Sequence, residues 1–227
     1  MIRVLEVLAT LRRAGAERVA VSLARGLDRG RFETAVVSLY NEFEGGFEPE
    51  LGADGVKAWH LGKRRGFDPR MWYRLARVFS AFRPDIIHTH SYVLRYVLPA
   101  WMTAPRGRVV HSIHNLAERE VDRAGRLVHR AAFRMGVVPV AISGEVARSF
   151  RSLYKRDPAA IIQNGADVEN GFRPGARESW RRLHGFGSGD LLIVSLARFE
   201  PQKNPGGLIT AFARALPELP CGHLVMA

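Results

Sequence analysis

The chain has 227 residues, 47% of them hydrophobic, which suffices for one large domain or somewhat more. Its formal net charge of +12 favours anionic partners such as nucleotide sugars, acidic lipids, nucleic acid or acidic glycans. A single cysteine excludes a disulfide framework, and no apolar run is long enough to cross a bilayer. We therefore expect a cytoplasmic protein and interpret the N-terminal apolar run as a strand, not a signal peptide.

Strands and helices are predicted to alternate along the first 170 residues, as in a doubly wound α/β domain with a parallel sheet. The expected strands lie at residues 2–9, 34–39, 56–61, 84–91, 108–113, 137–142 and 159–162. Pro139 lies inside one of them, which predicts an edge or irregular strand. Ser143 is expected to cap the helix that follows that strand.

The loop after the first strand places Gly15 at a strand-to-helix junction, where a missing side chain lets the backbone approach a ligand closely. A tight turn into the first helix is the alternative interpretation. The apolar residues of that helix fall on one predicted face, which consists of Val19, Ala20, Leu23, Ala24 and Leu27.

A basic amphipathic helix is predicted from Pro69 onward, directly after the basic cluster at residues 63–65. Its apolar side carries Met71, Trp72, Leu75, Val78, Phe79 and Phe82, and its other side carries Arg70, Arg74 and Arg77. The helix could pack its apolar side on the sheet, with the arginines in water. Alternatively, it could lie on an anionic membrane surface.

Four histidines lie on or just after two of the predicted strands. His88 and His90 are two residues apart, so they share one face of a strand. His90 and His114 come at strand carboxyl ends, where open parallel sheets bind ligands, and both are expected to face the cleft. Imidazole is a good zinc ligand, but this spacing matches no defined zinc motif and no cysteine completes one. We therefore expect no metal.

Residues 191–208 are predicted to form a strand buried on both faces, a cationic loop and a helix start. Asn204 suits the N-cap and Pro205 the first helical position. Free N–H groups at the helix start, together with Arg198 and Lys203, would form an anion site that fits a diphosphate without a metal. An ordinary crossover with two solvated cations is the alternative.

These stretches resemble the retaining, GT-B-fold sugar transferases grouped as glycosyltransferase family 4. The resemblance rests on the donor-loop residues Ala197, Arg198, Phe199, Gln202, Lys203 and Asn204, on the strand-end histidines, on the turn at Ser143 and on residues 164–167. The sequence departs from the family at Ala14 and Asn204, where glycine is usual.

The resemblance implies a GT-B type α/β fold with one complete Rossmann-like, doubly wound parallel-sheet domain and an incomplete second one. Residues 1–170 would be the N-terminal, acceptor-side domain. Residues 171–227 would begin the C-terminal, nucleotide-sugar-binding domain. Asn164 and Gly165 would form the hinge, and the Asn-Gly pair by itself favours a turn with positive φ.

The function that the resemblance implies is transfer of a sugar from a nucleoside-diphosphate sugar to a lipid or glycan hydroxyl, with retention and without a cofactor. It implies His114, Arg198 and Lys203 as catalytic residues. Gly15, Arg198, Lys203 and Asn204 would bind the donor phosphate, and Glu17, His90 and Asn115 would lie on the acceptor or sugar side. We interpret His88 and His111 as structural.

A complete second domain of this kind needs on the order of 150 residues, more than residues 171–227 provide. We therefore expect little or no transferase activity from this chain alone. A non-catalytic sugar- or lipid-binding fragment is one alternative. A basic nucleic-acid-binding protein is another, although the basic residues are scattered and no nucleic-acid motif is present. Lipid-linked acceptors would make an anionic membrane surface a further partner.

Overall fold

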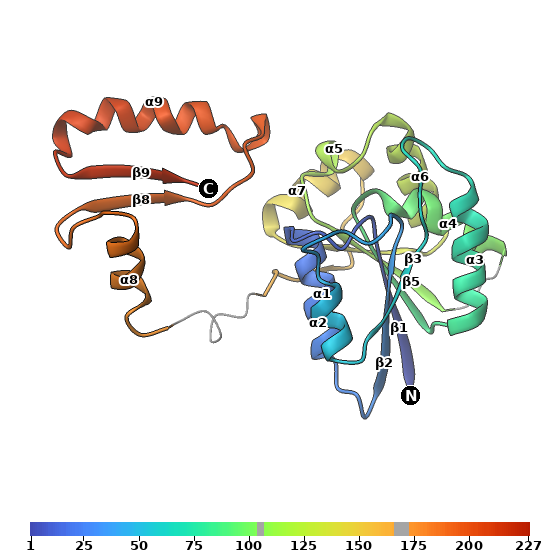
Figure 1. The fold of residues 1–227 in the computed structure, drawn as a ribbon. Coiled ribbons are helices and arrows are strands. Elements are labelled where there is room, and N and C mark those ends of the chain that lie inside the picture. Colours follow the sequence, from blue (N-terminus) through green and yellow to red (C-terminus); the bar gives the residue numbers. More distant parts are fainter. Residues whose placement is uncertain (104–106, 166–172) are drawn as a thin grey trace. The chain divides into compact units, whose positions relative to one another are not determined.

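The computed structural model describes residues 1–103, 107–165 and 173–227 and divides the chain into two compact units, Met1–Gly165 and Ala166–Ala227 (Figure 1). The domain boundary predicted near residue 170 lies outside the described residues, as do Ala166 and Asp167 of the Asn-Gly-Ala-Asp segment.

Within its described residues, the first unit contains a seven-stranded parallel sheet with the order β3-β2-β1-β4-β5-β6-β7. The strands are β1 Ile2–Leu8, β2 Phe32–Ser38, β3 Lys57–His60, β4 Ile86–His90, β5 Arg108–Ile113, β6 Val138–Ala141 and β7 Ala160–Ile161. The predicted doubly wound α/β fold is confirmed. The strand order reverses between β1 and β4, and sheets of this type bind ligands beyond the carboxyl ends of the strands at such a point.

Helices cover both faces of this sheet (Figure 1). Their bounds are α1 Gly15–Gly26, α2 Glu48–Ala53, α3 Arg70–Phe82, α4 Leu94–Thr103, α5 Ala117–Glu120, α6 Arg123–Arg134 and α7 Gly144–Tyr154, with a 3-10 turn η1 at Ser91–Val93. Side chains alternate across a strand, so β1 contributes to two separate cores. Leu5 and Val7 pack with residues of α3 and α4, whereas Leu8 packs with residues of α1 and α2.

Two details of the first unit correct the sequence analysis. Helix α1 buries Ala20, Val21 and Ala24, whereas Leu23 is 39% exposed, because the helix packs on the sheet through its smaller residues. Strand β6 is not an edge strand, since it pairs with both β5 and β7. The Pro139 carbonyl accepts a hydrogen bond from the Ala159 N–H at 2.8 Å, just before β7 begins. Because β7 is only two residues long, the missing N–H of Pro139 does not interrupt a long series of hydrogen bonds between the two strands.

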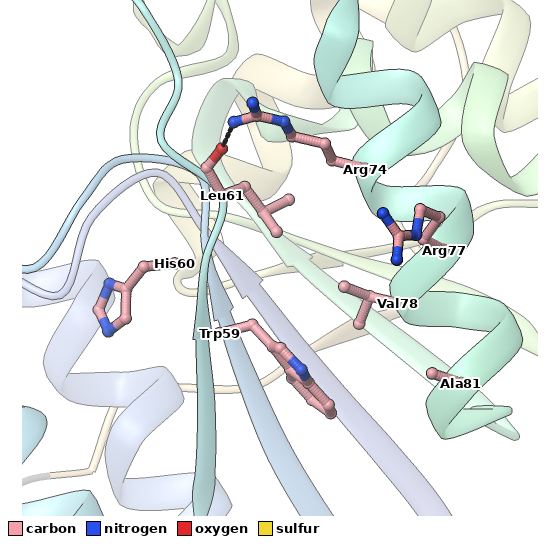
Figure 2. Close-up of a pocket in the computed structure, with 7 residues that line it drawn as sticks. All are labelled: Trp59, His60, Leu61, Arg74, Arg77, Val78 and Ala81. Atoms are coloured by element: carbon pink, nitrogen blue, oxygen red, sulfur yellow. Dashed lines mark hydrogen bonds between the residues drawn. The ribbon is translucent and has the colours of Figure 1, made fainter.

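Helix α3 packs most of its apolar side in the core, as one of the two interpretations predicted, but Trp72, which was placed on that side, is 37% exposed. Met71, Leu75 and Phe79 are buried, while the Arg74 side chain reaches the carbonyl of Leu61 on the edge of the sheet (Figure 2). A groove of about 360 Å³ lies between β3 and α3. None of the residues that the sequence analysis placed in the site lines this groove.

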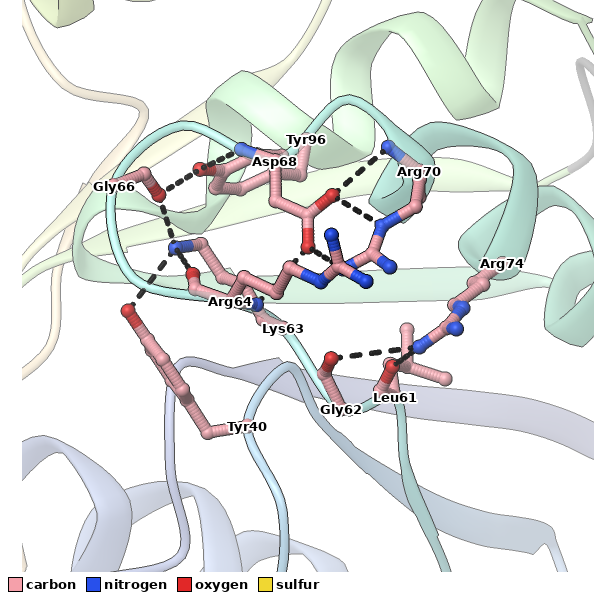
Figure 3. A network of polar contacts seen from close by, with 10 residues as sticks. All are labelled: Tyr40, Leu61, Gly62, Lys63, Arg64, Gly66, Asp68, Arg70, Arg74 and Tyr96. Atoms are coloured by element: carbon pink, nitrogen blue, oxygen red, sulfur yellow. Dashed lines mark hydrogen bonds and ion pairs between the residues drawn. The ribbon is translucent and has the colours of Figure 1, made fainter.

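The loop between β3 and α3 is held by a polar network that the sequence did not suggest (Figure 3). Lys63, from the predicted basic cluster, is buried, and its Nζ donates to the Tyr40 hydroxyl at 3.0 Å and to the Arg64 carbonyl at 2.9 Å. The Asp68 carboxylate accepts hydrogen bonds from the Arg64 backbone N–H and from the Arg70 side chain. These contacts hold the loop that leads into α3 in one conformation.

The second unit contains β8 Leu191–Ser195 and β9 Gly222–Met226, which pair in parallel, with the helices α8 Ala176–Leu183 and α9 Pro205–Ala215 and two 3-10 turns, η3 Pro201–Lys203 and η4 Leu216–Glu218. The prediction that β8 is buried on both faces is wrong. Val194 is 53% exposed, because β9 is the one strand that β8 pairs with among the described residues. In the described part of the chain, no helix combines the length and the apolar character needed to cross a membrane.

Candidate functional site

Five polar side chains form a continuous hydrogen-bonded cluster at the switch point of the sheet. Glu6 comes from β1, His88 and His90 from β4, Ser112 from β5, and His114 follows β5 directly. Because β1, β4 and β5 are neighbours in the sheet, residues 84 positions apart in the sequence come into contact. We call this set the switch-point cluster.

Glu6 lies at the centre of the switch-point cluster. Its Oε2 lies 2.7 Å from Nε2 of His90 and 3.0 Å from Nδ1 of His88. The other nitrogen of His88 hydrogen-bonds to the Ser112 hydroxyl at 2.8 Å, and Nδ1 of His90 hydrogen-bonds to Nε2 of His114 at 2.8 Å. One carboxylate therefore anchors two branches of hydrogen bonds.

The electrostatics favour an ionised Glu6 beside neutral His90 and His114. Burial alone would raise the pKa of Glu6. The adjacent imidazoles of His88 and His90 lower it by more than burial raises it, so the pKa of Glu6 is about 2. Burial lowers the pKa of His90, against the pull of Glu6. Burial and the neighbouring histidines lower the pKa of His114 to about 3. Near neutral pH Glu6 is thus ionised, while His90 and His114 are neutral.

His114 lies at the outer end of one branch and is half-buried. Its backbone N–H donates to Glu120 Oε1 at 3.3 Å. Burial raises the pKa of Glu120 to about 7, although backbone N–H groups of His114 and Asn115 oppose this shift. The Nδ1 atom of His114 is buried and has no hydrogen-bond partner among the described residues, so the ring retains an unmet polar atom.

His90 does not face an open cleft, which corrects the sequence analysis. Its side chain is 1% exposed, because its two nitrogens are engaged by Glu6 and His114. Glu6, His88 and His90 could also offer ligands to a metal ion, since one ligand atom of each lies within 4.8 Å of the other two. In this structure the same atoms hydrogen-bond to one another.

Other predicted site residues of the first unit lie on the loops that follow the strands. Gly15 is the first residue of α1, and a Cβ placed there would meet no atom within 4 Å, so the space in front of this residue is open. The Thr10 hydroxyl donates to Glu17 in the first turn at 3.1 Å. Asn115 is half-buried beside His114, and Ser91, directly after β4, has a φ of 56°. Strained backbone of this kind is common near functional sites.

The predicted diphosphate residues form a local group in the second unit. Asn204 caps α9, since its side chain accepts a hydrogen bond from the Gly207 N–H at 3.2 Å, and Pro205 is the first helical residue. Arg198 pairs with Glu200 at 2.9 Å and is mostly exposed, and Lys203 ends the preceding 3-10 turn and is exposed as well. The predicted capping arrangement is confirmed, and two exposed cations lie within seven residues of this helix start.

The two proposed hinge residues, Asn164 and Gly165, lie at the end of the described part of the first unit and are exposed. The expected positive φ is wrong, because neither residue adopts it. Asn-Gly favours a positive-φ turn mainly where two strands are joined tightly, and β7 ends at Ile161 without such a turn.

The sequence analysis missed Glu6, Ser112 and Glu120. Glu6 did carry a signal, since it is a charged residue inside a run predicted to be a buried strand, and buried charges are rare unless they are paired. His111 and His129 form a second buried pair on the opposite face of the sheet, where the His111 Nδ1 lies 2.9 Å from the Thr89 hydroxyl. His88 and His111 are thus held by internal hydrogen bonds.

Comparison with known proteins identifies relatives of this chain. A D-inositol 3-phosphate glycosyltransferase of Rhodococcus erythropolis is 32% identical over 159 residues, which are 63% of this chain and 35% of the relative. A protein of the same name from Nocardia farcinica is 29% identical over 155 residues, which are 58% of this chain and 32% of that protein. This chain thus matches about a third of the length of these curated relatives.

Solved structures share the GT-B fold. The Anabaena protein HepE, determined with UDP and glucose, superposes with a TM-score of 0.80 at 17% identity over the whole chain and 60% of HepE. Sucrose-phosphate synthase from Thermosynechococcus elongatus gives 0.74 at 14% identity over the whole chain and 62% of the synthase. At such identities the likeness establishes the fold alone. The family described as Glycosyltransferase Family 4 matches residues 13–170, which is more than half of the sequence, and the chain therefore belongs to this family.

Proposed function

We propose that the protein transfers a sugar from a nucleoside-diphosphate sugar to a hydroxyl of a lipid or glycan, with retention of configuration. The observation that carries this proposal is the switch-point cluster. It ends in His114 at the carboxyl edge of the sheet, in a chain that belongs to glycosyltransferase family 4. HepE, which shares the fold, was determined with UDP and glucose, and this supports a nucleotide-sugar donor.

The second unit supplies the groups that suit a departing diphosphate. When the bond between the anomeric carbon and the diphosphate oxygen breaks, its electron pair stays on that oxygen and negative charge grows there. The cations Arg198 and Lys203 and the N-terminus of α9 can neutralise this charge. In the first unit we assign the N–H of Gly15 to a donor phosphate and His114 to the sugar, with Glu17 and Asn115 on the acceptor side.

Replacing a cation should reveal this role. In a full-length parent with a complete nucleotide-sugar-binding domain, we expect Arg198→Ala or Lys203→Ala to lower turnover of UDP-glucose, used as the probe donor, by roughly 10²-fold, because each removes a group that stabilises the transition-state charge. Arg214→Ala is the matched control, since Arg214 is an exposed arginine in the last turn of α9. A loss below tenfold in both cation variants, or an equal loss in the control, would contradict the assignment.

We further propose that the first unit contacts an anionic membrane surface through Phe67, Trp72 and Tyr73, which we call the α3 aromatic surface. These side chains are 60%, 37% and 68% exposed, and Phe67 and Trp72 contact each other edge to face. Exposed arginines at positions 64, 65 and 77 lie on the same loop and helix. Aromatic rings at the lipid interface with cations beside them fit an anionic bilayer and a lipid-linked acceptor.

Vesicle co-sedimentation at low salt tests the α3 aromatic surface. We expect binding to vesicles that contain phosphatidylglycerol but not to vesicles of phosphatidylcholine alone, and a clear loss of binding in the double variant Phe67→Ser, Tyr73→Ser. Leu127→Ser is the control, because Leu127 is 65% exposed on a different helix, α6. Equal binding by the double variant and the control would refute the proposed surface.

A further inference from the structure

The hydrogen bonds of the switch-point cluster have a direction, because an ionised carboxylate can only accept. Each nitrogen that faces Glu6 must therefore carry the proton. This gives His88 a proton on Nδ1, which lies 3.0 Å from Glu6 Oε2, and His90 a proton on Nε2, 2.7 Å from the same oxygen. A neutral imidazole has one protonated nitrogen, so the second nitrogen of each ring is an acceptor.

The direction continues outward along both branches. On one branch, Nε2 of His88 accepts from the Ser112 hydroxyl at 2.8 Å. On the other branch, Nδ1 of His90 accepts, so the proton between the two rings must belong to Nε2 of His114, 2.8 Å away. The remaining nitrogen of His114, Nδ1, is then an acceptor with no donor among the described residues.

We infer that Glu6, acting through His90, holds His114 in the tautomer with the proton on Nε2, so that Nδ1 accepts a hydrogen bond from a ligand hydroxyl. Glu6 and His90 are positioning residues in this scheme, and His114 is the residue that meets the ligand. For the identity of the ligand the inference rests on the proposed function. The tautomer itself follows from the contacts of an ionised Glu6 and a neutral His90 and involves no ligand.

The tautomer decides which part of a nucleotide sugar His114 can bind. A phosphate oxygen without a proton is an acceptor and gains nothing from a second acceptor, whereas a sugar hydroxyl can donate to Nδ1. The structure thus assigns His114 to the sugar and not to the diphosphate. Because Nδ1 is shielded from solvent here, the half-buried ring has to tip outward for a hydroxyl to reach it.

The opposite face of the sheet offers an internal control. The Thr89 hydroxyl donates to the Val110 carbonyl at 3.1 Å, so the His111 Nδ1, 2.9 Å from the same hydroxyl, must donate to it. His111 is therefore expected to carry its proton on Nδ1, opposite to His114. This assignment involves no atom of Glu6, and so it should not respond to substitutions of Glu6.

Long-range ¹H–¹⁵N correlation spectra of the histidine rings in the 227-residue chain test the inference directly. At neutral pH we expect the proton on Nε2 for His90 and His114 and on Nδ1 for His88 and His111. A proton on Nδ1 of His114, or an even mixture of its two tautomers, would overturn the relay. This measurement needs neither a variant nor transferase activity.

A substitution tests the coupling between the rings. Glu6→Gln replaces one of the two acceptor oxygens by an N–H donor. If the amide NH₂ takes the place of Oε2, which faces both rings, the facing nitrogens of His88 and His90 must become acceptors, whereas an amide oxygen at that position leaves both protons in place. We expect the tautomer of His114 to change whenever the tautomer of His90 changes and to remain unchanged whenever that of His90 does. The tautomer of His111 should be unaffected. A change in the tautomer of His90 or His114 without a change in the other would refute the coupling. If the variant does not fold, the spectrum of the unsubstituted chain still tests the predicted tautomers.

A ligand titration separates the inference from the proposed function. With UDP-glucose as the probe, the Nδ1 resonance of His114 should move, whereas UDP alone should leave it in place. Binding of UDP-glucose without this movement would refute the hydroxyl assignment. A complete lack of UDP-glucose binding would count against the proposed function and its ligand assignment, while the tautomers would still be read from the free protein.

Discussion

Replacing Glu120 by glutamine should change how the stability of the first unit depends on pH. Burial raises the pKa of Glu120 from its ordinary value of 4.5 to about 7. Between these two values the folded protein holds a proton that the unfolded chain has released, so the free energy of unfolding falls as the pH rises. Each pKa unit corresponds to 1.36 kcal/mol, so ionised Glu120 costs about 3 kcal/mol at pH 8.

Glutamine resembles the protonated side chain and does not titrate, so Glu120→Gln should be close to the parent in stability at pH 4.5. At pH 8 it should be more stable by up to about 3 kcal/mol. Urea unfolding followed by tryptophan fluorescence measures this, in a Trp180→Phe background that confines the signal to the first unit.

The matched control is Glu118→Gln, because Glu118 is exposed on the same short helix. It should shift the free energy of unfolding equally at both pH values. A Glu120→Gln variant whose difference from the parent stays within 1 kcal/mol between pH 4.5 and pH 8 would refute the reasoning, since burial would then not have favoured the neutral acid.

Three further predictions concern the frame of the first unit, and each is measured by urea unfolding at neutral pH. Ser143→Ala should cost about 1 kcal/mol, because it removes the side chain that accepts from the Val146 N–H at the start of α7, and an unchanged midpoint would contradict this. Lys63→Met should cost about 1–3 kcal/mol, because it removes the charged donor that holds the Tyr40 hydroxyl and the Arg64 carbonyl, while Arg65→Met should cost less than about 0.5 kcal/mol, because Arg65 is exposed. Phe79→Ala should cost about 3–5 kcal/mol, because the ring is fully buried in the core under α3, and a cost below 1 kcal/mol would show that the helix does not pack as described.

The segments that were predicted well from the sequence are those in which the decisive interactions are local. Ser143 and Asn204 cap their helices by accepting hydrogen bonds from N–H groups three residues away. Such contacts can be predicted because both partners lie close together in the sequence. The alternation of strands and helices likewise indicated the parallel sheet, because a parallel connection needs a crossover. The strand-to-helix junction at Gly15 and the histidines at strand ends also indicated the correct edge of the sheet.

Burial of polar groups could not be predicted in the same way. The sequence indicates that Glu6 is in a strand, but only the order of strands in the sheet brings it to His90, 84 residues later. Lys63 was grouped with its basic neighbours, yet the fold surrounds it with Tyr40 and backbone carbonyls. Strand β8 has the composition of a buried strand, but its exposure depends on how many strands lie beside it.

The chain by itself thus determined where its elements begin, which helices are capped, and which family it resembles, because these follow from residues close together in the sequence. The tertiary structure decided which charges are buried, which partners the histidine nitrogens contact, and which strand faces remain exposed. Those properties depend on the dielectric and the hydrogen-bond partners that distant segments provide, and no local pattern records them.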